Sequence, residues 1–142
     1  MTQIDETPTP ATMSEPIVFI SRNRIVEGRH ADFGIAYARV SDLIRMTKPG
    51  TACFAAYADE AGTEVRVVHV FPNAEAMAFH FEGSADRSEA VAGLIAPTGF
   101  EVYGRAPAAA VDRLRREASA TGASVEVLAD PLGGFLRAPG DM

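Results

Sequence analysis

Apolar residues along the chain follow two different spacings, and each spacing predicts one kind of element. A period of two, which places alternate side chains on opposite faces of a strand, predicts strands at residues 17–26, 51–58, 63–71, 100–104 and 124–128. Spacings of three and four, which place side chains on one face of a helix, predict helices at residues 32–48, 74–82 and 107–122. A further short helix is expected to begin at Ser84, to carry Val91, Leu94 and Ile95, and to end before Pro97.

This order of elements is βαββαβ followed by a C-terminal extension. It predicts an α+β fold of the ferredoxin-like type, in which an antiparallel sheet carries its helices on one face. The other face is also apolar, because it carries Val18, Ile20, Val68 and Val70. Such a face would leave a large apolar patch in water. We therefore expect a second copy of the chain to cover it, giving a homodimer with an eight-stranded core, a dimeric α+β barrel.

The chain divides into three parts. Residues 1–15 are polar and contain two prolines, so they are expected to form a disordered N-terminal arm. Residues 16–106 hold the ferredoxin-like domain, and residues 107–142 hold the last helix, the short strand and a glycine-containing tail. Because the short strand needs a sheet edge to pair with, we expect this C-terminal segment to strap across the partner subunit.

Charge and composition exclude several classes of partner. The net charge is −6, which argues against a nucleic-acid surface. No apolar run approaches the roughly 20 residues of a membrane span, and the first residues lack the features of a secretory signal. The chain has one cysteine and so forms no internal disulfide. A cytoplasmic protein without nucleic-acid or membrane partners is expected.

Two short charged runs are interpreted as solvated helix faces. In the first, Arg113, Arg115 and Arg116 alternate with acidic residues of the last predicted helix. In the second, Asp86-Arg87-Ser88-Glu89, acidic residues fall in the first turn of the short helix, where the helix dipole favours them. Neither run is assigned to a site.

Two histidines and an amide are expected to meet at one seam between the sheet and its helices. The period of two places His69 and Phe71 on the same face of the strand at 63–71, and Asn23 on the matching face of the first strand. In the following helix, Met77 and His80 are three residues apart and face the sheet. A neutral imidazole accepts a proton near neutral pH. His80, His69 and Asn23 are therefore the candidate catalytic residues.

Four apolar and aromatic residues are the candidates for binding a substrate beside these polar groups: Phe71, Met77, Phe33 and Tyr37. No third histidine, cysteine or carboxylate stands at a ligand spacing from the two histidines, so no metal site is predicted. No glycine-rich phosphate loop or nucleophile elbow is present, and the residues therefore indicate no nucleotide cofactor.

Each candidate also has a structural interpretation. His80 can bond a backbone carbonyl or a neighbouring side chain inside a filled core. Asn23, if buried, needs a partner because an unsatisfied amide costs about 1–3 kcal/mol. That partner is either a ligand oxygen or a backbone group, and the residues leave both readings open.

The order of elements, the segment from Arg24 to Gly28 and the run from Phe71 to His80 resemble the antibiotic biosynthesis monooxygenase family of dimeric α+β barrels. The resemblance covers about residues 16–106. It implies a homodimeric monooxygenase that needs no cofactor and acts, with dioxygen, on an aromatic or polyketide-like quinol. The family also includes haem-degrading enzymes and proteins of unknown role, and the fold alone does not choose among them.

The first strand is also similar to that of the haem-degrading branch, in which an Asn, a Trp and a His flank the haem. Asn23 and His80 occupy the matching positions, which implies that His80 could ligate iron while Asn23 bonds a distal oxygen. Phe71 stands in place of the Trp, and the chain contains no tryptophan. Haem binding and a non-catalytic ligand-binding module are therefore the two alternatives to a cofactor-free oxygenase.

Overall fold

The computed structural model describes residues 15–137, which form one sheet and four helices. In chain order, the elements are β1 (Ile17–Ile25), α1 (His30–Thr47), β2 (Cys53–Ala58), β3 (Glu64–Phe71), α2 (Ala74–Phe81), α3 (Ser84–Ala90), β4 (Ile95–Tyr103), α4 (Ala108–Thr121) and β5 (Ser124–Leu128). The α+β class and the ferredoxin-like order of elements are confirmed. The expected arm falls almost entirely in residues 1–14, which lie outside the described residues, as do residues 138–142.

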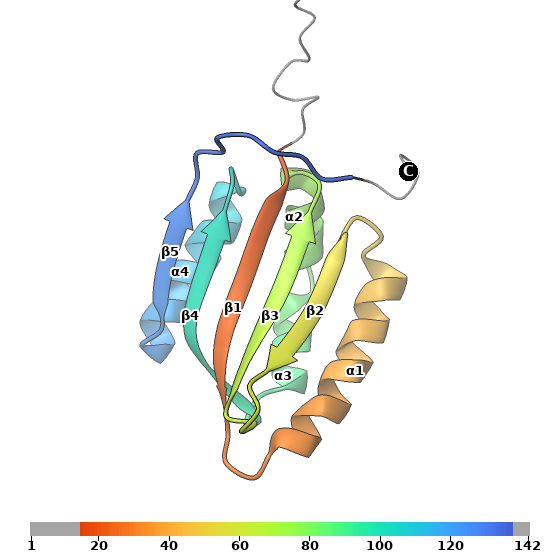
Figure 1. Cartoon of the computed structure of the whole chain (residues 1–142), viewed down its shortest axis with the longest axis vertical. Helices are drawn as coiled ribbons and strands as arrows, with labels where there is room; N and C mark the ends of the chain where they lie inside the picture. Colours follow the sequence, from red (N-terminus) through yellow and green to blue (C-terminus); the bar gives the residue numbers. More distant parts are fainter. Residues whose placement is uncertain (1–14, 138–142) are drawn as a thin grey trace, which may run out of the picture.

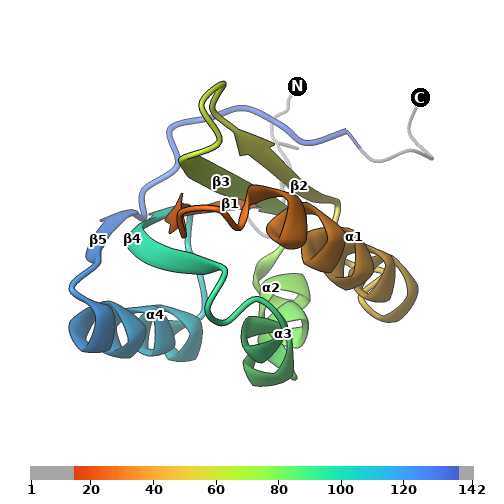
Figure 2. The same ribbon diagram turned by 90° about the horizontal axis from the view of Figure 1, so that it is seen from below.

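The sheet has the strand order β2-β3-β1-β4-β5. The first four strands pair antiparallel, as predicted, and β5 joins the edge parallel to β4, so the complete sheet is mixed. All four helices lie on one face of the sheet (Figures 1 and 2). Within the described residues, none of these helices has both the length and the apolar character needed to cross a lipid bilayer.

The two faces of the sheet follow the predicted parity. On the helix side, β3 buries Val65, Val67, His69 and Phe71, and β1 buries Ile17, Phe19 and Asn23. On the other side, Val18 lies opposite Val70, and Ile20 lies opposite Val68. No described helix covers this second face. Residues 129–137 run across one end of it (Figures 1 and 2).

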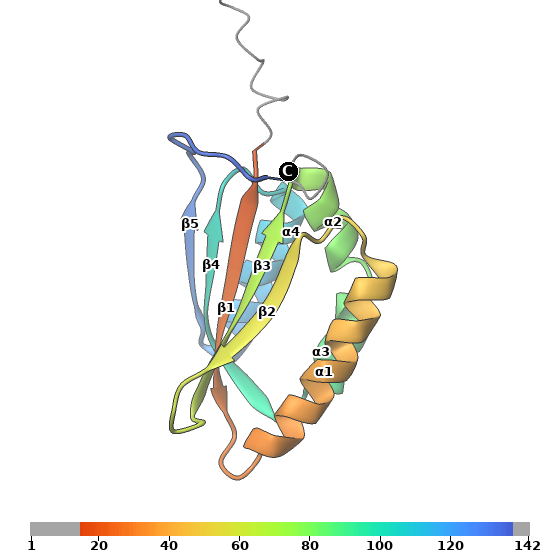
Figure 3. The ribbon, with the colours of Figure 1, turned by 45° about the vertical axis from the view of Figure 1, so that its right-hand side comes forward.

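The core is divided into two clusters, because the helices contact the sheet at separate places. The larger cluster lies under α2 and α4, and the smaller one joins Ile25, Phe33, Val65 and Leu94. Figure 3 shows α1 running beside the edge strand β2, with α3 behind α1 and α4 behind the sheet. The space between the two clusters is where the candidate site lies.

The prediction was wrong at the start of β4. The short helix α3 ends at Ala90, and Leu94 and Ile95 lie beyond it; β4 begins at Ile95 rather than near residue 100. Pro97 does not stop a helix but lies within the strand, opposite Asn23, next to a register shift between Arg22 and Asn23. Since β5 pairs only with residues 99–103 of β4, Pro97 has no strand on its other side and its missing N–H disrupts no ladder there.

Candidate functional site

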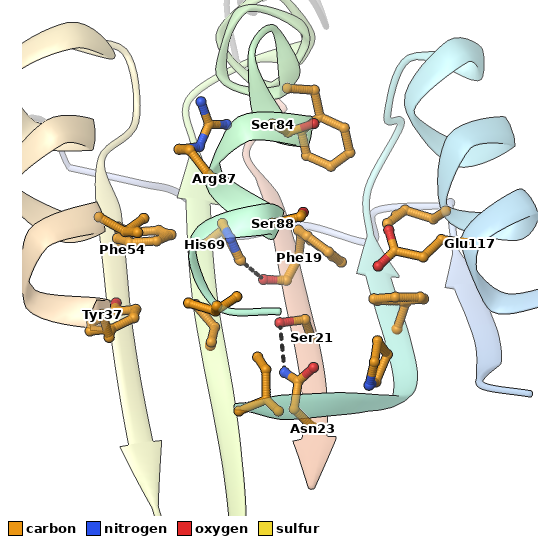
Figure 4. Close-up of a pocket in the computed structure, with 18 of the residues that line it drawn as sticks. Phe19, Ser21, Asn23, Tyr37, Phe54, His69, Ser84, Arg87, Ser88 and Glu117 are labelled. Carbon is orange, nitrogen blue, oxygen red and sulfur yellow. Dashed lines mark hydrogen bonds between the residues drawn. The ribbon is translucent and has the colours of Figure 1, made fainter. Parts of the chain in front are cut away.

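A pocket of about 320 Å³ lies between the sheet and its helices. Its lining comes from all four helices and from β1, β2, β3 and β4. Figure 4 shows Tyr37 and Phe54 on one side and Glu117 on the opposite side, with Arg87 and Ser84 near one end and Asn23 at the other. Pockets of roughly 300–1,000 Å³ with mostly apolar walls are typical of small-molecule sites.

His69 projects from the middle of β3 into this pocket (Figure 4). Its ring stacks on the Phe19 ring with centroids 4.6 Å apart, and its Nδ1 donates to the Phe19 carbonyl oxygen at 3.0 Å. A carbonyl only accepts hydrogen bonds, so Nδ1 carries the proton and Nε2 carries the lone pair. Burial lowers the pKa of His69 to about 4, although the carbonyl groups of Phe19 and Val67 oppose that change. The imidazole is therefore neutral near pH 7.

His80 reaches the same pocket from α2, a helix that begins where Asn73 accepts a hydrogen bond from the Ala76 N–H at 2.9 Å. Its Nδ1 lies 2.8 Å from Thr51 Oγ1, and either atom can be the donor. Burial, with smaller effects of the neighbouring His69 and of the charges of Arg87 and Lys48, lowers the pKa of His80 to about 3. His80 is also neutral near pH 7, but its tautomer is not fixed by a carbonyl.

Asn23 lies at one end of the pocket and is only 5% exposed. Its side-chain N–H donates to Ser21 Oγ at 3.3 Å, two residues earlier on the same face of β1. The register shift between Arg22 and Asn23 coincides with this position. The partner found for this buried amide is thus a side chain, and not the backbone group that the structural interpretation expected.

Phe33 and Tyr37 from α1 form one wall of the pocket, together with Phe54 from β2. The Tyr37 and Phe54 rings are stacked with centroids 5.2 Å apart. The Tyr37 hydroxyl is buried and finds no hydrogen-bond partner within residues 15–137. Burial, with smaller effects of Cys53 and Tyr57, raises the pKa of Tyr37 above its ordinary value, so the hydroxyl keeps its proton and can donate a hydrogen bond to a bound oxygen.

Phe71 and Met77 do not line the pocket, contrary to the prediction. Both side chains are completely buried in the larger core cluster. Phe71 lies on the predicted face of β3. It is the last residue of the strand, however, and α2 covers the sheet there. Its ring lies 5.1 Å from the ring of His80, so it supports that histidine from the core side.

Three charged residues of the pocket were not recognised in the sequence. Arg87, Arg113 and Glu117 all line it, whereas the runs containing the two arginines had been interpreted as solvated faces. That interpretation holds for Arg115 and Arg116, which are exposed. Helical phase contained the missed signal: positions 113 and 117 follow the buried Ala110 by three and seven residues and therefore border the apolar stripe of α4.

The residues around His80 do not fit haem. The rings of His69, Phe54 and Phe71 have centroids 5.1–5.8 Å from the His80 ring, and a macrocycle coordinated by His80 would have to displace them. Phe71, which replaces the Trp of the haem-degrading branch, belongs to the core. Residues 15–137 also contain no group of three or more His, Cys, Asp or Glu side chains that could hold a metal ion.

Comparison with known proteins connects the fold, though not the activity, to a known group. No protein-family model matches the chain, and no curated protein matches it. Among solved structures, MupZ from Pseudomonas fluorescens has a TM-score of 0.60 at 19% identity and covers 88% of this chain and 96% of its own. A putative antibiotic biosynthesis monooxygenase from Caulobacter crescentus has a TM-score of 0.56 at 13% identity, covering 63% of this chain and 89% of its own.

SnoaB, a cofactor-independent oxygenase from Streptomyces nogalater, has a TM-score of 0.54 at 15% identity and covers 63% of this chain and 91% of its own. The expected resemblance to antibiotic biosynthesis monooxygenases is thereby confirmed at the level of the fold. At these identities the likeness assigns no activity and no residue role.

Proposed function

We propose that this protein is a monooxygenase that needs no cofactor and oxidises an aromatic or polyketide-like phenol or quinol with dioxygen. The observation that carries the proposal is the buried His69 imidazole, which lies in an apolar pocket with its Nε2 lone pair fixed by the bond from Nδ1 to the Phe19 carbonyl. A base held in one tautomer at a substrate-sized cavity is what such a reaction requires.

In this mechanism, His69 Nε2 takes the proton of the substrate hydroxyl. A base with a lowered pKa is weak, but the charge of Arg87, which lines the pocket and helps to lower the pKa of both histidines, also stabilises a substrate anion there. The Asn23 amide and the Tyr37 hydroxyl are available to donate hydrogen bonds to the developing oxyanion. His80, which is hydrogen-bonded to Thr51, lines the pocket beside His69.

The anion then reacts with dioxygen directly. It gives one electron to dioxygen, and the two radicals join through a new carbon–oxygen bond to form a substrate peroxide. The oxygen–oxygen bond then breaks as the carbon loses its remaining hydrogen as a proton, and that proton and the one held by His69 both go to the outer oxygen. One oxygen atom remains in the product as a carbonyl group, and the other leaves as water, so dioxygen receives four electrons from the substrate.

Oxygen uptake on 1,8-dihydroxyanthrone tests the proposal. We expect one dioxygen consumed for each anthraquinone formed, faster than the spontaneous reaction, and one labelled oxygen atom in the product when labelled dioxygen is supplied. Ligand binding without any acceleration would instead favour a non-catalytic binding module. Activity that appears only after haem is added would contradict the cofactor-free mechanism.

We also propose that the protein is a homodimer that pairs through the sheet face opposite the helices. Val18, Ile20, Val68 and Val70 lie side by side on that face, and no described helix covers them. The tail beside it carries Leu132 and Phe135, which are 97% and 76% exposed. A second copy would remove both groups of side chains from water.

A further inference from the structure

The pocket is lined by cationic and polar side chains from α3 and α4, and one acidic side chain, Glu117, lines it with them. Arg87 comes from α3 and Arg113 from α4, and both line the pocket. Neither forms an ion pair within residues 15–137, where the salt bridges found involve other residues. In a protein with a net charge of −6, two unpaired guanidinium groups at a cavity are unusual and need an explanation.

Arg87 is held in place by the backbone. One terminal nitrogen donates to the Glu82 carbonyl at 3.2 Å, and the other donates to the His80 carbonyl. Guanidinium has five N–H groups, so these bonds leave others free. Burial and, to a smaller extent, the charge of Arg113 lower the pKa of Arg87, as expected for two like charges that line the same cavity.

Ser84 adds a neutral donor at the same end of the pocket (Figure 4). Its hydroxyl oxygen is buried and finds no hydrogen-bond partner within residues 15–137. A buried unsatisfied hydroxyl is costly, and an oxygen atom of a ligand would satisfy it. Glu117 is the acidic residue that lines the pocket, and it forms no ion pair with Arg113 although it lies one helical turn further along α4.

We propose that this end of the pocket binds a carboxylate, so that the substrate is an aromatic acid with its carboxylate held by Arg87, Arg113 and the Ser84 hydroxyl. Its phenolic end then extends toward His69. Paired N–H groups of arginine match the two oxygens of a carboxylate. This assignment deepens the proposed function by naming the charge class of its substrate and the residues that select it.

The test compares two fluorescent probes that differ in charge but hardly in shape, 6-hydroxy-2-naphthoate and its methyl ester. Each is titrated into the full-length protein, and the dissociation constant is read from the change in probe fluorescence. We expect the acid to bind at least about tenfold more tightly than the ester, because a hydrogen bond to a charged group contributes about 1.5–3 kcal/mol. The preference should shrink as salt is added.

Variants on α4 locate the effect. Arg113→Met should remove most of the preference for the acid and leave binding of the ester nearly unchanged. Arg116→Met is the matched control, since it makes the same change on the same helix at an exposed position outside the pocket. Glu117→Gln should strengthen binding of the acid alone. A substitution of Arg87 would be less informative, because the hydrogen bonds of Arg87 to two carbonyls also support the chain between α2 and α3.

The outcomes separate this inference from the proposed function. Acid preference that Arg113→Met abolishes supports the carboxylate site even if no oxygen uptake is found. Equal or weaker binding of the acid, or no binding of either probe, overturns it, even if neutral phenols are oxidised. An equal loss for both probes in Arg113→Met would assign Arg113 to packing and would also overturn it.

Discussion

The imidazole rings of His69 and His80 stand edge to face, at 89° to each other with centroids 5.3 Å apart. They come from a strand and from the helix that follows it, and both are buried. Two imidazoles at this distance do not both hold a proton readily, because each positive charge disfavours the other. The pair therefore remains neutral over the physiological pH range and can accept one proton from a ligand.

Stability should depend on pH through this pair. Both pKa values are lowered in the folded protein, to about 4 for His69 and about 3 for His80, from an unfolded value near 6.5. Below pH 6.5 the unfolded chain binds protons that the folded chain does not, so the free energy of unfolding falls as pH falls toward about 4. Between about pH 7 and pH 5, the free energy of unfolding is expected to fall by an amount on the order of 3 kcal/mol. Urea unfolding between about pH 7 and pH 5 measures it, and a His69→Asn/His80→Asn double variant should show a flatter dependence.

His69→Asn should strongly slow catalysis without disturbing the fold. The Asn side-chain N–H can replace Nδ1 as the donor to the Phe19 carbonyl, but Asn has no counterpart of Nε2. We expect kcat to fall by roughly 10²–10⁴, the usual contribution of a general base. His80→Asn, which keeps a partner for Thr51, should cause the smaller loss. A larger loss for His80→Asn, at equal melting temperatures, would move the base to His80.

Tyr37→Phe should separate binding from stability. The substitution removes a buried hydroxyl that has no partner within residues 15–137, so the free energy of unfolding should stay the same or rise slightly. Binding of a phenolic ligand should weaken roughly two- to tenfold if the hydroxyl donates to it. Thermal unfolding and a ligand titration on the same variant check both parts. Lower stability with unchanged binding would show that the hydroxyl serves the fold.

Met77→Ala should destabilise the protein by about 2–5 kcal/mol, since it opens a cavity in the core. Met77 is completely buried. Met46→Ala on α1 is the matched control: that side chain is 78% exposed, and the change should stay within about 0.5 kcal/mol. Chemical denaturation of both variants measures the two changes in the free energy of unfolding. A small effect at Met77, combined with weaker ligand binding, would return Met77 to the pocket wall.

Val68→Asp should break the proposed dimer, because it places a charge in the middle of the uncovered sheet face, opposite Ile20. Sedimentation of the wild type should give a dimer, and that of Val68→Asp a monomer or a weaker dimer. Ala78→Asp, at an exposed position of α2, should leave the dimer unchanged. Unchanged sedimentation of Val68→Asp would argue that another surface forms the contact.

Local sequence predicted most of the elements, because strand and helix periods depend on neighbouring residues. The parity of β1 and β3 placed Asn23, His69 and Phe71 on the helix side. Gly62, with φ of +73°, occupies the turn between β2 and β3, a backbone conformation that glycine adopts without strain. The start of β4 was missed since Pro97 usually ends an element, and only the partial pairing of β5 explains why it is tolerated there.

The sequence by itself determined the order of the elements and the face on which each candidate side chain lies. The tertiary structure alone decided which candidates share a cavity, because that depends on where along a strand a helix covers it: α2 closes over Phe71, whereas His69, two residues earlier, stays open to the pocket. It also decided which nitrogen of His69 is the base, through a carbonyl 50 residues away. Arg87 and Arg113 line one pocket only because the fold brings α3 and α4, which are separate in the chain, to the same cavity.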